Sequence, residues 1–114
     1  MIDELADVEG VGHEVAAITA RAMRGEVDFD ESFRTRLALL KGLNSDAVAI
    51  LADRLPIKEG LREMTTTLRA RGMTLAIFSG GFLPIAKRLQ QDFGFDEVVA
   101  NALETKGGIV TGEV

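Results

Sequence analysis

The stretch of sequence that decides the fold reads Met73-Thr74-Leu75-Ala76-Ile77-Phe78-Ser79-Gly80-Gly81-Phe82. Residues 73–78 are mostly apolar and uninterrupted, which is typical of a strand buried on both faces of a parallel sheet. A Ser-Gly-Gly corner follows at once, and apolar residues at helical spacing lie on both sides. Helix, buried strand, glycine corner and helix together predict an α/β unit. The helical positions are Leu61, Met64 and Leu68 before the strand, closed by Gly72, and Phe82, Ala86, Leu89 and Phe93 after it.

The Ser79-Gly80-Gly81 corner is a candidate phosphate site. Ligands of parallel α/β sheets bind beyond the carboxyl ends of the strands, where this corner lies. Ser79 offers a hydroxyl, the glycines let backbone N–H groups approach an anion, and the next helix directs its N-terminus to the same place. Pro84 fits the first turn of that helix, because the N–H that proline lacks has no partner there. The alternative is an ordinary strand-to-helix turn, since Ser-Gly is common turn chemistry.

The composition is that of an ordinary globular protein and restricts its partners. The chain has 114 residues, 46% hydrophobic and 27% charged, which corresponds to one domain or part of one. A net charge of −5 argues against nucleic acid as a main partner. No cysteine is present, which excludes disulfides, thiolate nucleophiles and metals bound by sulfur. No stretch approaches the roughly 20 apolar residues that span a bilayer, and no signal pattern is present, so we expect a cytoplasmic protein without a membrane partner.

The first 55 residues predict helices and no strand. Apolar residues at helical spacing mark four segments, which are separated by glycines and ended by Pro56. Asp28 and Glu31 stand three apart before the third segment, in a pattern close to a capping box. The expected helices cover residues 2–8, 11–24, 29–41 and 45–54.

Beyond Ile57 the pattern changes to alternating helices and strands. Glu97 to Asn101 predicts a second buried strand. Residues 103–105 and 109–114, joined through Lys106-Gly107-Gly108, predict a small antiparallel hairpin. Two strands and a hairpin do not complete a doubly wound sheet, so we expect the chain to be the middle of a larger protein.

Short segments spread along the chain carry a resemblance to a known family. The segments are Ile2-Asp3-Glu4-Leu5-Ala6, Gly10-Val11, Ile18-Thr19, Ala22-Met23-Arg24-Gly25, Asp28-Phe29, Ser32-Phe33-Arg34-Thr35-Arg36, Leu39-Leu40-Lys41-Gly42-Leu43, Ser79-Gly80-Gly81-Phe82, Ala100-Asn101-Ala102-Leu103 and Thr111-Gly112. Taken in order, they resemble the phosphoserine phosphatases of the haloacid dehalogenase superfamily over essentially the whole chain. The resemblance implies a partial Rossmann-like α/β core with an α-helical cap, residues 1–55 being the cap and linker and residues 56–114 the core.

The resemblance implies hydrolysis of O-phospho-L-serine through an aspartyl-phosphate intermediate with Mg²⁺, the last step of serine biosynthesis. Ser79, with the amide of Gly80, matches the motif that holds the phosphoryl oxygens. Arg36 matches the cap arginine that pairs with the substrate carboxylate, a task suited to a planar guanidinium. Met23 and Phe29 match cap positions that wall the substrate pocket and exclude water. The alternatives are core packing for Met23 and Phe29, and a solvated helix arginine for Arg36.

The catalytic groups of that family are expected to lie outside residues 1–114. The Asp-x-Asp-x-Thr nucleophile segment, the catalytic lysine and the later Gly-Asp-Gly-x-Asn-Asp metal segment find no match here. We therefore expect no catalytic residue and no Mg²⁺ ligand in this chain. Asp28-Phe29-Asp30-Glu31-Ser32 imitates the nucleophile segment, but no buried strand precedes it, which makes Asp28 a helix cap instead.

Three other polar residues, Asp3, Glu4 and His13, are expected on the surface of cap helices. A single histidine without cysteine cannot form a site for a soft metal.

Two hypotheses of different classes follow. In the first, the chain is part of a phosphoserine phosphatase and is inactive alone. In the second, it is a non-catalytic module that binds a phospho-ligand or associates with another chain through unpaired strand edges beside Met73–Phe78. Other phosphatases and a phosphotransferase of the superfamily share the Ser-Gly-Gly corner, and Arg36 favours an amino-acid phosphate among them.

Overall fold

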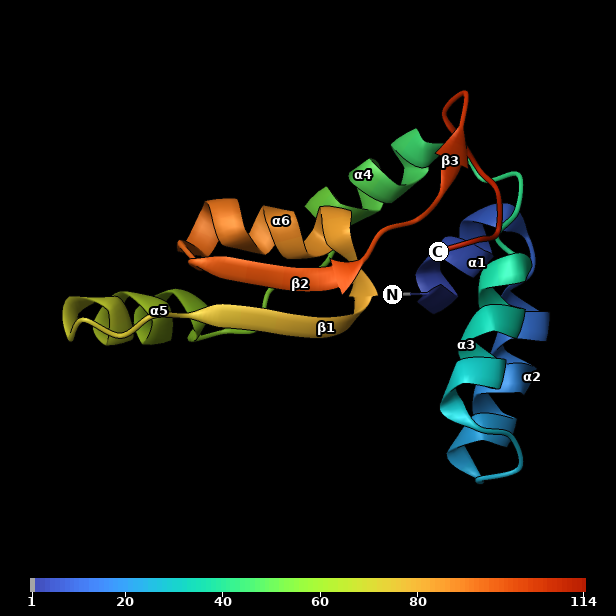
Figure 1. The fold of residues 1–114 in the computed structure, drawn as a ribbon, viewed down its shortest axis with the longest axis horizontal. Coiled ribbons are helices and arrows are strands. Elements are labelled where there is room, and N and C mark those ends of the chain that lie inside the picture. Colours follow the sequence, from blue (N-terminus) through green and yellow to red (C-terminus); the bar gives the residue numbers. More distant parts are fainter. Residues whose placement is uncertain (1) are drawn as a thin grey trace. The chain divides into compact units, whose positions relative to one another are not determined.

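The computed structural model describes residues 2–114, which form two compact units. The first unit joins the residues up to Leu51 to Leu103–Val114, and the second comprises Ala52–Ala102. Figure 1 labels the elements, which follow one another in the order helices, strand, helix and strands. In chain order they are α1 (Ile2–Glu9), α2 (Gly12–Met23), α3 (Phe29–Ala38), α4 (Ser45–Arg54), α5 (Leu61–Ala70), β1 (Ala76–Phe82), α6 (Leu83–Phe93), β2 (Glu97–Asn101), β3 (Thr105–Lys106) and β4 (Ile109–Val110).

The helices of the first unit pack through the apolar stripes that the sequence predicts. α1 packs on α2 and α2 packs on α3, with Leu5, Val15 and Leu37 fully buried. α3 begins where expected, because the carboxylate of Asp28 accepts a hydrogen bond from the backbone N–H of Glu31 at 2.9 Å. The prediction that Asp28 is a helix cap is therefore confirmed.

The β3–β4 hairpin turns through Gly107 and Gly108, both with positive φ, as a tight hairpin turn of this kind requires. The hairpin also pairs with the segment before α4. The N–H of Gly42 donates to the carbonyl of Val110 at 2.9 Å, and the N–H of Val110 donates to the carbonyl of Leu43 at 2.8 Å. These hydrogen bonds explain why the hairpin clusters with the helices, whereas the sequence places it with the expected core of residues 56–114.

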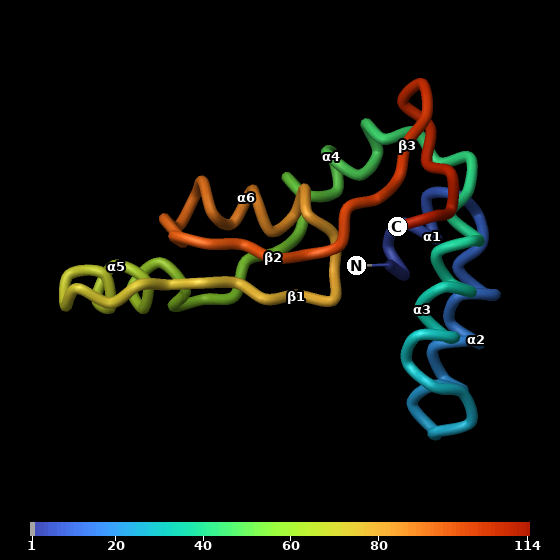
Figure 2. Tube along the Cα trace, in the orientation of Figure 1, coloured from blue at the N-terminus to red at the C-terminus, as the bar shows by residue number. Residues whose placement is uncertain are grey.

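The second unit is built on two parallel strands. β1 and β2 pair with Ala76 opposite Glu97 and Phe78 opposite Val99. Figure 2 traces the chain from β1 through α6 to β2, the crossover that parallel pairing demands. The bounds of β2 agree with the prediction, and Pro84 lies in the first turn of α6 as expected.

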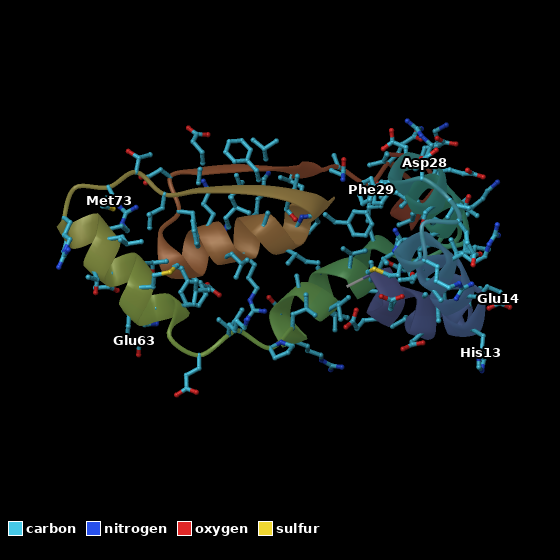
Figure 3. The ribbon with its side chains drawn as sticks, turned by 90° about the horizontal axis from the view of Figure 1, so that it is seen from below. His13, Glu14, Asp28, Phe29, Glu63 and Met73 are labelled. Atoms are coloured by element: carbon cyan, nitrogen blue, oxygen red, sulfur yellow. The ribbon has the colours of Figure 1, made fainter. Side chains whose placement is uncertain are left out.

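One face of this two-stranded sheet is uncovered among the described residues. α6 packs on both strands and α5 on α6, and Figure 3 shows both helices on the same side of the sheet. On the other side Phe78 is 78% exposed and Val99 is 54% exposed. The prediction of a strand at residues 73–78 buried on both faces is wrong, because the strand begins at Ala76 and helices cover one face alone. The unbroken apolar run indicates two apolar faces but not which elements cover them.

Asp96 links the beginnings of the two strands. Its Oδ2 accepts the N–H of Leu75 at 2.8 Å, and its own N–H donates to the carbonyl of Leu75 at 2.7 Å. Nη1 of Arg69 lies 3.3 Å from Oδ1. The hydrogen bond from Leu75, assisted by the Arg69 guanidinium, holds the pKa of the Asp96 carboxyl below its ordinary value.

Asp96→Asn is therefore expected to lower the free energy of unfolding at pH 7. A carboxylate with a depressed pKa stabilises the fold above its unfolded-state pKa of about 4 and loses that contribution as the pH falls further. The difference between wild type and variant should thus be constant at neutral pH and shrink below about pH 4. Urea unfolding followed from pH 7 downward measures it. Glu59→Gln, at an exposed turn position, is the control, and a difference for Asp96→Asn that does not change with pH would contradict the expectation.

Candidate functional site

The Ser79-Gly80-Gly81 corner is an exposed irregularity at the carboxyl end of β1. Between the paired positions Phe78–Val99 and Phe82–Asn101, β1 advances by four residues (79–82) and β2 by two (100–101). Bulged strands of this kind redirect side chains next to functional sites. Ser79 and Gly80 are accordingly exposed, although they belong to a strand.

Two hydrogen bonds hold the peptide group between Gly80 and Gly81. The side-chain amide of Asn101 donates to the carbonyl of Gly80 at 2.9 Å. At the other end of the peptide, the N–H of Gly81 donates to Oγ of Ser79 at 2.9 Å. The Gly80 carbonyl, whose partial negative charge would repel an anion, is thereby directed to Asn101. Because Ser79 Oγ accepts a hydrogen bond, its own proton remains to be donated to an oxyanion.

α6 begins directly after this corner, with Phe82 as its N-cap residue. The partial positive charge of a helix N-terminus favours anions, and its first N–H groups point away from the helix. A hydroxyl donor and a helix N-terminus therefore follow one another within five residues of the chain, 79–83. This arrangement suits a phosphoryl group.

Arg36 is the second candidate, and it belongs to the first unit. Its Nε donates to the carbonyl of Ser32 at 3.2 Å, and its Nη1 donates to Oγ1 of Thr19 at 3.2 Å. Both acceptors are neutral, and no acidic side chain within residues 2–114 forms a salt bridge with Arg36. Three of its five N–H groups remain for a ligand.

Arg88 shows what a structural arginine looks like in the same chain. Arg36 and Arg88 are both half-buried. Arg88, however, pairs with Asp92, with Nε 3.4 Å from Oδ2, and also donates to the carbonyls of Ala52 and Leu55 near the end of α4. Arg36 is half-buried and has no salt bridge among residues 2–114, which is the state expected of a group that binds an anion.

Met23 and Phe29 lie at the two ends of the connection between α2 and α3, and both are exposed. Met23 is 84% exposed and Phe29 is 65% exposed, so the alternative of core packing is wrong for both. Phe29 stacks on Phe33, with ring centroids 5.9 Å apart, and Arg36 follows on the same face of α3 at helical spacing i, i+4, i+7. Two aromatic rings thus lie on the same face of α3 as the Arg36 guanidinium. In the view of Figure 3, Asp28 and Phe29 lie on the opposite side of the helical unit from His13 and Glu14.

The described part of the chain offers no site that fits a metal ion. No three side chains of histidine, aspartate or glutamate in residues 2–114 come together in a way that could hold one. The Mg²⁺ that the resemblance implies does not fit the residues present, and we derive no step through it. No helix among residues 2–114 has the length and apolar character to cross a membrane.

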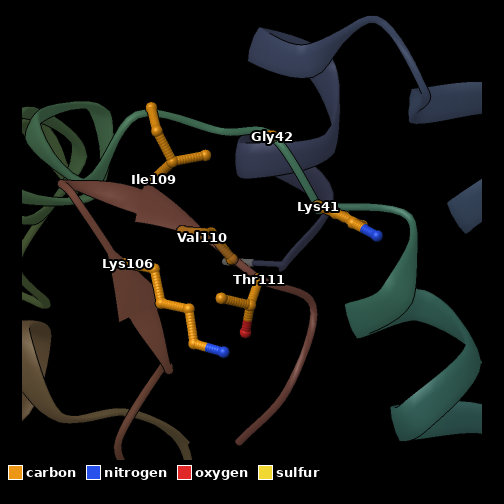
Figure 4. A pocket seen from close by; sticks show the side chains of 6 residues that line it. All are labelled: Lys41, Gly42, Lys106, Ile109, Val110 and Thr111. Carbon is orange, nitrogen blue, oxygen red and sulfur yellow. The ribbon is translucent and has the colours of Figure 1, made fainter.

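A hollow of about 360 Å³ lies between the chain after α3 and the β3–β4 hairpin, and none of the predicted site residues lines it (Figure 4). One of its two lysines, Lys106, already has a carboxylate beside it, which disfavours an anion there. Glu104 lies 3.8 Å from Nζ of Lys106 and accepts the hydroxyl of Thr111 at 2.8 Å. The lining residues are Lys41, Gly42, Lys106, Ile109, Val110 and Thr111.

Comparison with known proteins decides the family. The sequence matches the haloacid dehalogenase-like hydrolases over residues 1–111. The chain belongs to this family. It is 42% identical over 114 residues to a phosphoserine phosphatase of Streptococcus thermophilus, covering all of this chain and 53% of that protein.

Two solved structures of phosphoserine phosphatases have the fold of this haloacid dehalogenase-like hydrolase. A substrate-bound complex and a phospho-aspartyl intermediate analogue each have a TM-score of 0.88 and 38% identity. The similarity covers 98% of this chain and 53% and 54% of theirs, respectively. The chain spans about half the length, or less, of the curated relatives that it matches.

Sequence reasoning missed Thr19 and Asn101 as parts of the two candidate sites. Asn101 gave a usable signal, because a polar amide ends the apolar strand Glu97–Asn101 at the sheet edge where ligands bind. Thr19 gave none, since its contact with Arg36 joins residues 17 positions apart on two helices.

Asn101→Asp is expected to loosen the corner. An aspartate of nearly the same shape places a second acceptor against the Gly80 carbonyl, so the peptide group loses one anchor. The amide proton of Gly81 should then exchange with solvent about three- to tenfold faster, the factor that a hydrogen bond of about 1 kcal/mol corresponds to. NMR hydrogen exchange measures the rate. Ser79→Ala should also raise the exchange rate of the Gly81 amide, because it removes the acceptor of that N–H. An unchanged Gly81 rate in both variants would show that the corner is held by other contacts.

Proposed function

We propose that residues 1–114 supply the phosphate-binding corner and the substrate-binding cap of a phosphomonoesterase that converts O-phospho-L-serine to L-serine and phosphate. The names of the relatives support this substrate, and one of the similar structures is a substrate-bound complex. The observation that carries the proposal is the Ser79 hydroxyl, which accepts the N–H of Gly81 and therefore presents its own proton at the N-terminus of α6.

In this proposal Ser79 donates its hydroxyl proton in a hydrogen bond to a non-bridging phosphoryl oxygen, and the amide of Gly80 assists. Hydrogen bonds to a charged acceptor are stronger than neutral ones, and they strengthen further as charge develops in the transition state. Asn101 keeps the Gly80 carbonyl directed away from that oxygen.

Arg36 binds the carboxylate of the substrate in the same proposal. Its charge has no acidic partner within residues 2–114, and three N–H groups are available for a planar carboxylate. Met23 and Phe29, apolar and exposed, wall the ligand and exclude water from the phosphorylated enzyme.

The reaction that fits is a two-step transfer. An aspartate carboxylate oxygen attacks phosphorus, the bond to the serine oxygen breaks, and that oxygen takes a proton. Water then attacks the phosphorus of the aspartyl phosphate and gives up a proton, and the bond from phosphorus to the carboxyl oxygen breaks, which releases phosphate and regenerates the carboxylate. One similar structure is a phospho-aspartyl intermediate analogue, which supports this route. We assign the nucleophile to none of the 114 residues and propose that the chain alone is inactive.

The setting of this activity is also part of the proposal. The product, L-serine, makes the reaction suitable as the last step of serine biosynthesis in the cytoplasm. Any divalent cation would supply charge neutralisation at the phosphoryl group, and no group of three or more acidic or histidine side chains in residues 2–114 could hold it.

Phosphate release from O-phospho-L-serine tests the proposal. The 114-residue chain should give none, whereas a hybrid in which it replaces the matching segment of the Streptococcus thermophilus enzyme should turn over. In that hybrid Ser79→Ala should lower kcat/KM about 10- to 100-fold, the range for losing one hydrogen bond to a charged group. Thr74→Ala, exposed before β1, is the matched control.

Turnover by the 114-residue chain itself would overturn the proposed inactivity. An effect of Ser79→Ala no larger than that of Thr74→Ala would overturn the role of the corner.

A self-associating module is the second candidate, favoured by the uncovered sheet face. Phe78 and Val99 stand opposite each other in register and are both exposed, and within the described chain each strand has one unpaired edge. Sedimentation velocity of the 114-residue chain should then show concentration-dependent association that Phe78→Ser weakens. Met64→Ser, at an exposed position on α5, is the control. A monomer at all concentrations would count against this candidate.

A further inference from the structure

Thr19 connects α2 to α3 through its hydroxyl. Its Oγ1 donates to the carbonyl of Val15 one turn earlier in α2, at 3.0 Å, and accepts Nη1 of Arg36 on α3, at 3.2 Å. Thr19 is itself half-buried. The Thr19 hydroxyl therefore donates one hydrogen bond and accepts another.

We propose that Thr19 is a positioning residue that sets the orientation of the Arg36 guanidinium for a ligand carrying a carboxylate. The inference rests on the proposed function in one respect, namely that Arg36 receives that carboxylate. Thr19 itself does not contact the ligand in this proposal, and its effect on binding passes through Arg36.

The direction of the hydroxyl follows from its two bonds. The bond to the Val15 carbonyl uses the one proton of Thr19, so a lone pair is left to face α3. A β-branched side chain in a helix has few χ1 rotamers, and this bond selects among them. The acceptor offered to Arg36 is thus fixed in place before any ligand arrives.

Because the Thr19 hydroxyl is neutral, it can orient the Arg36 guanidinium without cancelling its charge. An aspartate or glutamate at the same place would neutralise the guanidinium and compete with an incoming carboxylate. Thr19 and the carbonyl of Ser32 hold Arg36 from two helices without removing its charge. A long side chain that is already oriented loses less conformational entropy when it binds.

The first test is made on the 114-residue chain and needs no ligand. NMR of the arginine side chains measures how fast the Arg36 guanidinium rotates about its Nε–Cζ bond. Thr19→Val, which keeps the shape and removes the acceptor, should raise that rate about three- to tenfold. Thr19→Ser, which keeps the hydroxyl, should leave it within about twofold.

Thr35→Val is the matched control for this measurement. Thr35 makes the same bond to a carbonyl four residues earlier, from its Oγ1 to Glu31 at 2.8 Å, but its hydroxyl accepts no hydrogen bond from an arginine among residues 2–114. Its variant should leave the Arg36 rate unchanged. If Thr19→Val does not fold, Thr19→Ala makes the same comparison. A rate that Thr19→Val or Thr19→Ala raises no more than Thr35→Val does would overturn the proposal.

The second test uses the active hybrid and two substrates. O-phosphoethanolamine is O-phospho-L-serine without its carboxylate. Thr19→Val should raise KM about three- to tenfold for O-phospho-L-serine, with kcat nearly unchanged, and should not raise KM for O-phosphoethanolamine. Equal effects on both substrates would mean a general structural role and would overturn the positioning role.

Arg36→Ala separates the two proposals in the same assay. If it leaves the preference for O-phospho-L-serine over O-phosphoethanolamine unchanged, the proposed role of Arg36 fails, and the inference about the ligand fails with it. If Arg36→Ala abolishes the preference and Thr19→Val does not reduce it, the role of Thr19 alone fails.

Discussion

The parallel pairing of β1 with β2 is the constraint on which the second unit depends. Parallel neighbours cannot be joined by a tight turn, so the chain must cross over the sheet, and α6 is that crossover. The same pairing brings the carboxyl ends of both strands to one edge of the sheet. Asn101 thereby reaches Gly80, and the corner at Ser79 acquires its anchored peptide group.

The two candidate sites share one physical principle, which is that neutral groups orient the binding group. At the corner, an amide and a peptide N–H fix Gly80 and Ser79. On α3, a hydroxyl and a carbonyl fix Arg36. Two other arginines with structural hydrogen bonds have acidic partners, since Arg69 pairs with Asp96 and Arg88 pairs with Asp92. Within residues 2–114 Arg36 forms no such salt bridge, which supports its proposed role in binding a carboxylate.

Local patterns in the sequence were sufficient to predict most of the elements. The helix cap at Asp28, the proline in the first turn of α6 and the strand Glu97–Asn101 all depend on neighbours within a few positions, and all are confirmed. The resemblance to the phosphoserine phosphatases predicted the family. The bounds of β1 were less predictable, because the apolar run continues through Met73 to Leu75, which lie before the strand.

Contacts between distant segments could not be predicted in the same way. The exposure of Phe78 depends on which helices cover a sheet, and no pattern inside β1 contains that information. The bond between Thr19 and Arg36 depends on how α2 and α3 are rotated against each other. The pairing of the hairpin with Gly42 and Leu43 joins residues that are separated in the sequence by the whole of Ala52–Ala102. The roles of Ser79, Arg36, Met23 and Phe29 in binding stay predictions.

The pairing of the β3–β4 hairpin with residues 42–45 limits the order in which the first unit can fold during synthesis. Backbone groups of residues 42–45 obtain their partners from residues 108–110, after all of Ala52–Ala102 has been made. A nascent chain emerges N-terminus first, and loop closure over such a separation costs entropy before it gains contacts. The backbone groups of residues 42–45 therefore stay without these partners until residues 108–110 have been synthesised.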